Sequence, residues 1–191
     1  MRRRALISWS GGKDSAWALR KAQASGIEPV ALLTTFNEAT SHIPIHQVPM
    51  PLIQAHAERL GLALRTVPLP WPCKNEEYLR RLDQAFQSAV SEGIDTIVFG
   101  DIHLADIRAF REQSLAGTGL TPVFPLWGSD TAQLAAEIIA AGINATITAV
   151  DERLLPTSLI GRRYDHEFLA ALPPSIDPCG EKGEFHTVVW L

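Results

Sequence analysis

The segment from residue 6 to residue 15 carries the residues of this chain that are best suited to chemistry. It reads Leu-Ile-Ser-Trp-Ser-Gly-Gly-Lys-Asp-Ser and leads from an apolar strand through two glycines into an amphipathic helix. Gly11 and Gly12 let the backbone approach an anion closely, and the following helix points its unpaired amides and positive dipole end at the same place. Further donors flank the glycines: Ser10, Lys13 and Ser15. The segment therefore predicts a site for a phosphate-bearing ligand.

The carboxylate of Asp14 narrows the type of ligand. It would repel a bare phosphate, so its presence favours a ligand that arrives with Mg²⁺, held by Asp14. This indicates a nucleotide polyphosphate. The loop is not a Walker A motif, because Ile7 stands where that motif needs its first glycine, and a dinucleotide fingerprint begun by Gly117 and Gly119 fails at Pro122. A tight turn that merely starts a helix remains the alternative interpretation.

Residues 10–15, Ser-Gly-Gly-Lys-Asp-Ser, resemble the PP-loop signature of the ATP pyrophosphatase superfamily, whose members cleave ATP between the α and β phosphates. Nearly the whole chain is similar to the diphthine–ammonia ligase family within that superfamily. The blocks that carry this resemblance, in order, are Gly100-Asp101-Ile102 followed by Arg108, then Pro125-Leu126-Trp127, Asp177-Pro178-Cys179-Gly180-Glu181 and Gly183-Glu184-Phe185-His186-Thr187. The C-terminal block is the most discriminating, because other PP-loop enzymes lack it.

The resemblance implies ATP-dependent amide formation with ATP and Mg²⁺. A carboxylate is adenylated, pyrophosphate leaves, and ammonia displaces AMP. The loop would stabilise the departing pyrophosphate electrostatically through Ser10, Gly11, Gly12, Lys13 and Ser15, with Lys13 and Asp14 as catalytic residues. The family's acceptor is diphthine on elongation factor 2 in archaea and eukaryotes, and another carboxylate would serve elsewhere.

Further site residues follow at the carboxyl ends of the expected strands, where nucleotides rest in parallel sheets. Thr34, with Thr35 beside it, could contact the adenosine, or could be a strand residue without a ligand. Gly100 is placed in the nucleotide site and Asp101 is expected to hold the metal or orient the nucleophile; a plain helix N-cap is the alternative for Asp101. Arg108 would bind a carboxylate or phosphate of the substrate.

The C-terminal block, from its alternation with glycines, is expected to fold over the site as a lid. Glu181, Glu184 and His186 are its substrate-binding candidates, and Glu184 is the first candidate for the catalytic base that takes a proton from ammonium. A surface turn before an edge strand is the alternative interpretation. Cys179 is interpreted as a packing thiol more readily than as a nucleophile.

His42 and His46 have a spacing that can hold a metal on a helix. Pro44 lies between them and no cysteine or carboxylate is close, so a loop that faces the substrate is the better interpretation.

The elements that must position these residues alternate between short apolar runs and longer helical patterns. This predicts an α/β fold of three layers: a mostly parallel, twisted sheet of about five strands with helices on both faces, similar to the adenine nucleotide alpha hydrolases, plus a small C-terminal lid. The expected strands are 5–9, 29–35, 63–67, 96–100 and 145–150, with a shorter one at 123–126 and a late one at 185–190. The expected helices are 13–25, 51–60, 76–92, 104–115 and 131–141.

Composition sets the remaining expectations. The 191 residues are divided into an ATP-binding domain (1–150) and a C-terminal segment that completes the substrate site (151–191). A net charge of −4 and two widely separated cysteines disfavour nucleic acid and the tRNA-modifying branch of the superfamily. We expect a cytoplasmic enzyme without membrane segments, and the sequence allows a homodimer. A nucleotide sensor without turnover is the other alternative.

Overall fold

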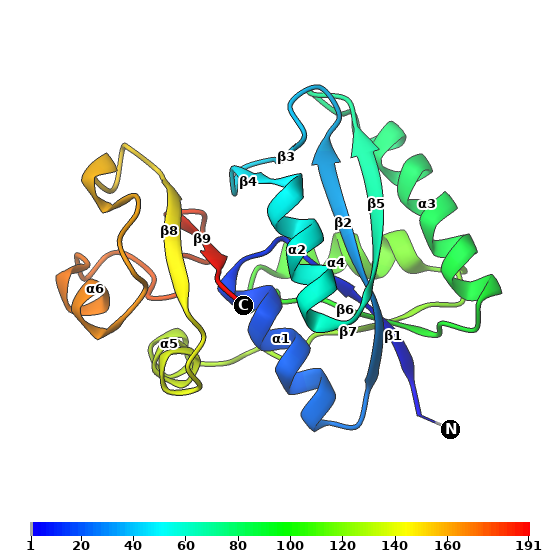
Figure 1. The fold of residues 1–191 in the computed structure, drawn as a ribbon, viewed down its shortest axis with the longest axis horizontal. Helices are drawn as coiled ribbons and strands as arrows, with labels where there is room; N and C mark the ends of the chain where they lie inside the picture. The colour runs from blue at the N-terminus through cyan, green and yellow to red at the C-terminus, as the bar shows by residue number, and fades with distance from the viewer. Residues whose placement is uncertain (1) are drawn as a thin grey trace.

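The structure is a computed structural model that describes residues 2–191. The first strand, β1 (Arg4–Ser8), lies in the middle of a twisted sheet (Figure 1), with a parallel strand on each side of it. Its parallel strands follow the order β5-β2-β1-β6-β7. Their bounds are β2 (Glu28–Asn37), β5 (Ala63–Leu69), β6 (Thr96–Val98) and β7 (Thr121–Val123). A two-residue hairpin, β3 (His42–Ile43) and β4 (Val48–Pro49), adds to the end of β2 in antiparallel fashion.

Helices cover both faces of this sheet, because its strands are apolar on both sides. Ala5 and Ile7 of β1 join the core under α1 (Lys13–Ala24) and α2 (Met50–Leu60). Leu6, on the opposite face, joins the core under α3 (Asn75–Ser91) and α4 (Ala105–Leu115). The α/β fold with a mostly parallel sheet between helices is therefore confirmed.

A second, two-stranded sheet lies beside the first and is antiparallel (Figure 1). It pairs β8 (Ala145–Val150) with β9 (Phe185–Val189) and is accompanied by α5 (Thr131–Ala140), a short 3-10 helix (Thr157–Leu159) and α6 (His166–Ala171). The prediction that 145–150 belongs to the parallel sheet was wrong. An apolar run specifies a buried strand but not its partner, and here the fifth parallel strand is β7. β7 also begins and ends earlier than the expected 123–126.

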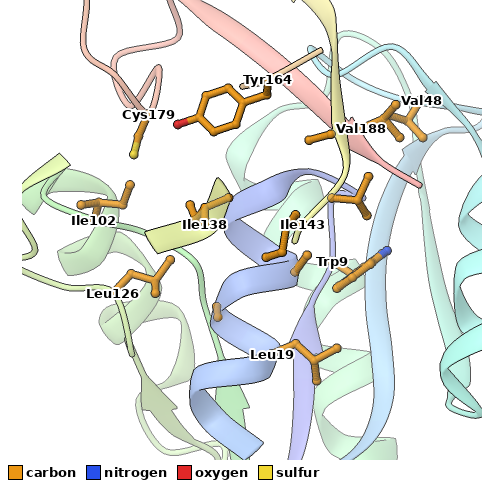
Figure 2. Close-up of a cluster of buried hydrophobic side chains, with 14 of the residues drawn as sticks. Trp9, Leu19, Val48, Ile102, Leu126, Ile138, Ile143, Tyr164, Cys179 and Val188 are labelled. Carbon is orange, nitrogen blue, oxygen red and sulfur yellow. The ribbon is translucent and has the colours of Figure 1, made fainter. Parts of the chain in front are cut away.

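Both sheets share one continuous core. Ile138 of α5, Phe168 of α6 and Phe185 of β9 belong to the same buried cluster as Leu19 of α1 and Trp9. Figure 2 shows Ile138 and Ile143 next to α1, with Val188 of β9 close to Val48 of the hairpin. The C-terminal residues are thus packed directly on the loop between β1 and α1. No helix among residues 2–191 is long and apolar enough to cross a membrane.

Candidate functional site

The two glycines between β1 and α1 are required for different reasons. Gly11 has a φ of +80°, and a Cβ at this position would lie 2.9 Å from Cδ1 of Ile53. Gly12 is the N-cap of α1, and a Cβ there would lie 3.2 Å from the carbonyl oxygen of Thr187 in β9. The loop is therefore confined between α2 on one side and the C-terminal strand on the other.

The two serines of the loop shape the start of α1. The Ser10 hydroxyl accepts from the amide of Gly12 at 3.2 Å, and the Ser15 hydroxyl donates to the carbonyl of Gly12 at 2.9 Å. The two hydroxyl oxygens are 3.5 Å apart. The structure thus brings together the hydroxyls, glycines and helix N-terminus that the sequence assigned to an anion site.

Strand β9 clamps this loop. The amide of Val189 donates to the carbonyl of Gly11 at 2.8 Å, and the amide of Lys13 donates to the Thr187 hydroxyl at 3.1 Å. His56 of α2 adds a third link: its Nδ1 accepts from the Trp9 indole at 3.3 Å, so its Nε2 carries the proton that faces the Val189 carbonyl at 3.0 Å. Burial lowers the pKa of His56, against the effect of the bond to the Val189 carbonyl.

Lys13 is the most deeply buried charged group of the site, with 2% of its surface exposed. Its Nζ donates to both carboxylate oxygens of Asp14, at 3.0 and 2.9 Å, and to the carbonyl oxygen of Cys179. It also lies over the rings of Tyr164 and Phe185, at 5.1 and 5.4 Å from their centroids. Burial is the largest single effect and lowers the pKa of Lys13, but the charge and hydrogen bonds of Asp14 together with the charges of Cys179 and Glu181 outweigh it, and the pKa stands above its ordinary value.

Asp14 lies in the first turn of α1 with 31% of its side chain exposed. Residues 2–191 contain no group of three or more His, Cys, Asp or Glu side chains able to hold a metal ion. Both oxygens of this carboxylate already accept from Lys13, and each has a further lone pair that could face a Mg²⁺ ion carried largely by phosphate oxygens and water, as this ion is commonly bound. Asp14 is thus compatible with the metal role that the sequence gave it.

Gly100, two residues after the end of β6, allows the chain to approach the start of α1 closely. A Cβ on Gly100 would lie 3.0 Å from the carbonyl carbon and oxygen of Asp14 and 3.2 Å from the amide nitrogen of Ser15. Gly100 therefore allows its backbone to pack closely against the backbone of Asp14 and Ser15. Thr34, in β2, is 1% exposed, and its hydroxyl donates to the carbonyl of Trp9 at 2.6 Å, so this side chain supports the loop from below.

Asp101 forms an ion pair that the sequence did not suggest. Its carboxylate accepts from Nε and Nη2 of Arg111 at 2.6 and 3.2 Å, and the Arg111 guanidinium lies 4.5 Å from the centre of the Phe99 ring. The N-cap alternative for Asp101 is wrong, because α4 begins only at Ala105 and its N-cap is Leu104.

Arg108 stacks on aromatic rings of the neighbouring block. Its guanidinium lies 4.9 Å from the centre of the Phe124 ring and 4.7 Å from that of Trp127, and its Nε donates to Glu112 at 2.8 Å. These contacts hold the guanidinium beside the two aromatic rings.

The C-terminal loop, residues 173–184, joins α6 to β9 and carries two acidic candidates. Oε1 of Glu181 accepts from the amides of Ile102 and His103 at 2.9 and 3.0 Å, which fastens the loop to the segment after β6. Burial raises the pKa of Glu181, against the effect of these two amides. Glu184 is 4% exposed and accepts from two amides of its own loop, those of Asp177 at 3.2 Å and Lys182 at 2.9 Å.

The two histidines of the hairpin formed by β3 and β4 have different surroundings. The rings of His46 and His186 are 4.6 Å apart, centre to centre, whereas Nδ1 of His42 lies 2.7 Å from the carbonyl of Thr40. Burial lowers the pKa of both His46 and His186 to about 4, and the charge of Lys13 adds to the effect. The hairpin also borders a cavity of about 360 Å³ that is lined by His42, Ile45 and the exposed Trp71.

Arg111 and Tyr164 were missed in the sequence, and His56 and Thr187 were given no role there. His56 and Thr187 contact Trp9 and Lys13, which lie 47 and 174 positions away in the chain, so no local spacing reveals these contacts. Tyr164 and Thr187 are both buried, which the structure shows and the sequence does not, and the one sequence signal for Thr187 is its place in the C-terminal family block.

Comparison with protein families matches the chain in two parts. A model described as the diphthamide synthase N-terminal domain matches residues 1–121, and one described as the diphthamide synthase C-terminal domain matches residues 130–190. No curated protein matches the chain. The two matched regions meet at the clamp between the loop and β9.

Proposed function

Because the chain belongs to the diphthamide synthase family, we propose that it is an ATP-dependent, AMP-forming amide ligase similar to the diphthine–ammonia ligases. The observation that carries the proposal is the loop at the N-terminus of α1, where two glycines, two serines and the Asp14 carboxylate lie together. Such a site suits a triphosphate better than a neutral ligand.

In the first step, an oxygen of the acceptor carboxylate attacks the α-phosphorus of ATP. The bond from this phosphorus to the bridging oxygen of the β-phosphate breaks, and pyrophosphate leaves with the electron pair. The amides of α1 that follow Lys13, together with the Ser10 hydroxyl, would bind the departing phosphates, since the Lys13 amide and the Ser15 hydroxyl already donate to protein oxygens. Asp14 would hold Mg²⁺, which neutralises charge on the leaving group.

In the second step, ammonia attacks the acyl carbon and AMP leaves. The attacking nitrogen must lose a proton, and a carboxylate with a raised pKa is suited to accept it. We assign this role to Glu181, since burial raises its pKa and it is anchored on the segment after β6. Glu184, the candidate suggested by the sequence, is given the task of ordering the C-terminal loop through its two amide contacts.

The acceptor is a carboxylate, and the molecule that bears it must approach the site from the solvent side, where Asp14 is exposed. For a chain of archaeal or eukaryotic origin this is the diphthine of elongation factor 2, by similarity to the family. The cavity beside the hairpin offers polar groups from Asn37, Thr40 and His42 together with the Trp71 side chain. We place in it the part of the acceptor molecule that is attached to the carboxylate.

The test is to incubate the protein with ATP, Mg²⁺, ammonium and candidate carboxylates, and to identify the products. AMP and pyrophosphate that form only with a carboxylate, together with the amide, support the ligase. Asp14→Asn should abolish AMP formation, whereas Asp106→Asn, an exposed aspartate in the first turn of α4, should leave it unchanged. Glu181→Gln should release pyrophosphate but slow amide formation.

Two outcomes would refute the proposal. ATP bound without turnover under every condition would identify a nucleotide sensor. AMP formation that requires tRNA would place the chain with the tRNA-adenylating enzymes of the superfamily.

A further inference from the structure

We propose that Lys13 is a positioning residue that joins the loop between β1 and α1, the nucleotide loop, to the C-terminal loop, and that it does not bind the phosphates. All three acceptors that Nζ contacts are protein oxygens: two of Asp14 and the carbonyl of Cys179. A lysine ammonium has three hydrogens to donate, so this set satisfies it.

The surroundings of the ammonium make this position hard to leave. The side chain is 2% exposed, and the Tyr164 and Phe185 rings lie within 5.4 Å of Nζ. A buried ammonium that left its carboxylate would leave that carboxylate without its counter-charge. Reaching a phosphate would require Lys13 to give up these contacts together.

The contacts of Lys13 come from both parts of the chain. Its amide bonds to Thr187 of β9, its ammonium bonds to the carbonyl of Cys179 in the C-terminal loop, and its carboxylate partner is its own neighbour in α1. The Tyr164 hydroxyl donates to the carbonyl of Pro178 at 2.8 Å and holds the same stretch of loop. Lys13 therefore fixes the Asp14 carboxylate and the C-terminal loop relative to each other.

This arrangement deepens the proposed function, on which the nucleotide part of the inference rests. The Lys13–Asp14 pair is neutral as a unit, so loop amides and the Ser10 hydroxyl would bind the phosphates, and Asp14 would hold the Mg²⁺ that neutralises their charge. The loop that carries Glu181 is positioned by the same lysine. Lys13 thus sets the distance between the adenylation site and the base of the amidation step.

The first test uses the wild-type protein without ATP. Lysines are acetylated with an amine-reactive reagent and the sites are quantified by mass spectrometry. We expect Lys13 to react at least about tenfold more slowly than Lys21, a half-exposed lysine of the same helix that is paired with Glu137. Labelling of Lys13 as fast as Lys21, with protection only when ATP is added, would overturn the proposal. This result is independent of whether the chain is a ligase.

The second test measures hydrogen exchange in Lys13→Met without ATP, with Lys21→Met as the matched control. Methionine keeps an apolar stem of similar length and removes the ammonium. We expect the amides of the C-terminal loop to exchange about tenfold faster in Lys13→Met and at the wild-type rate in Lys21→Met. Unchanged exchange in the C-terminal loop of a folded Lys13→Met protein would overturn the proposal, and the labelling test decides if the variant does not fold.

The third test separates the positioning role from phosphate binding. The α,β-methylene analogue of ATP is titrated without Mg²⁺ against Lys13→Met and against the double variant Lys13→Met/Asp14→Asn. The single variant should bind about tenfold more weakly, since Asp14 then faces the phosphates without its partner, and the double variant should return to within about threefold of wild type. A double variant as weak as the single one would show that Lys13 binds phosphate. A wild-type protein that does not bind the analogue would refute the proposed function, while the first two tests still decide the position of Lys13.

Discussion

The histidine pair beside the nucleotide loop makes the protein sensitive to acid in a predictable range. His46 and His186 have ring centres 4.6 Å apart, and burial lowers the pKa of each from 6.5 to about 4. His186 also faces the charges of Lys13, Asp14 and Glu184, of which only Lys13 lowers its pKa. In the unfolded chain both rings take up a proton near neutral pH, whereas in the folded protein they stay neutral. These two histidines therefore do not reduce the free energy of unfolding above pH 6.5, and they reduce it progressively as the pH falls towards 4.

The size of this effect follows from the pKa shift. Such a histidine lowers the free energy of unfolding by about 1.4 kcal/mol for every unit that the pH falls between its pKa in the unfolded chain and its pKa in the folded protein. Between about pH 7 and about pH 5 this amounts to ~2 kcal/mol for each ring. Because both rings are partly exposed, solvent screening reduces the total for the pair to ~2 kcal/mol.

The assay is urea unfolding at these two pH values for wild type and for His46→Gln/His186→Gln. The double variant should lose about 2 kcal/mol less than wild type on acidification, since glutamine does not titrate. His166→Gln, at an exposed position at the start of α6, is the matched control and should behave as wild type. An equal loss of stability in wild type and in the double variant would refute the reasoning.

Three further predictions concern the support of the loop. Gly100→Ala should weaken ATP binding and destabilise the fold by about 1–3 kcal/mol, because its Cβ would meet the Asp14 backbone at 3.0 Å; isothermal titration and urea unfolding measure the two effects. Thr187→Val should cost about 1–3 kcal/mol in urea unfolding, since it leaves the buried amide of Lys13 without its acceptor. Asp101→Asn should cost about 1–3 kcal/mol, because the guanidinium bound at 2.6 Å loses its charged partner; thermal unfolding detects this.

Each of these predictions has an outcome that contradicts it. Wild-type ATP affinity in Gly100→Ala would mean that the start of α1 can move aside without affecting the site. Full stability of Thr187→Val would show that water or another group replaces the hydroxyl. For Asp101→Asn, the informative control is Asp106→Asn, and equal melting temperatures of the two variants would exclude a structural role of the ion pair.

Local chemistry is what the sequence determined by itself. Glycine conformations, helix starts and short apolar runs are set by neighbours in the chain, so the loop from Ser10 to Ser15, the strand before it and the helix after it were predicted close to where they lie. The alternation of short apolar runs with helical patterns predicted the α/β fold class, which the observed sheet and the family match support.

Only the tertiary structure decided which distant groups meet. An apolar run such as 145–150 is equally suited to either sheet, and its pairing with β9 depends on what else can be buried there. The same holds for charges: Lys13 is next to Asp14 in the sequence, yet its third acceptor and its two aromatic neighbours come from residues about 150 positions or more further on. Spacing along the chain carries no information about such contacts. They arise because a buried ammonium must find acceptors wherever the packed core supplies them.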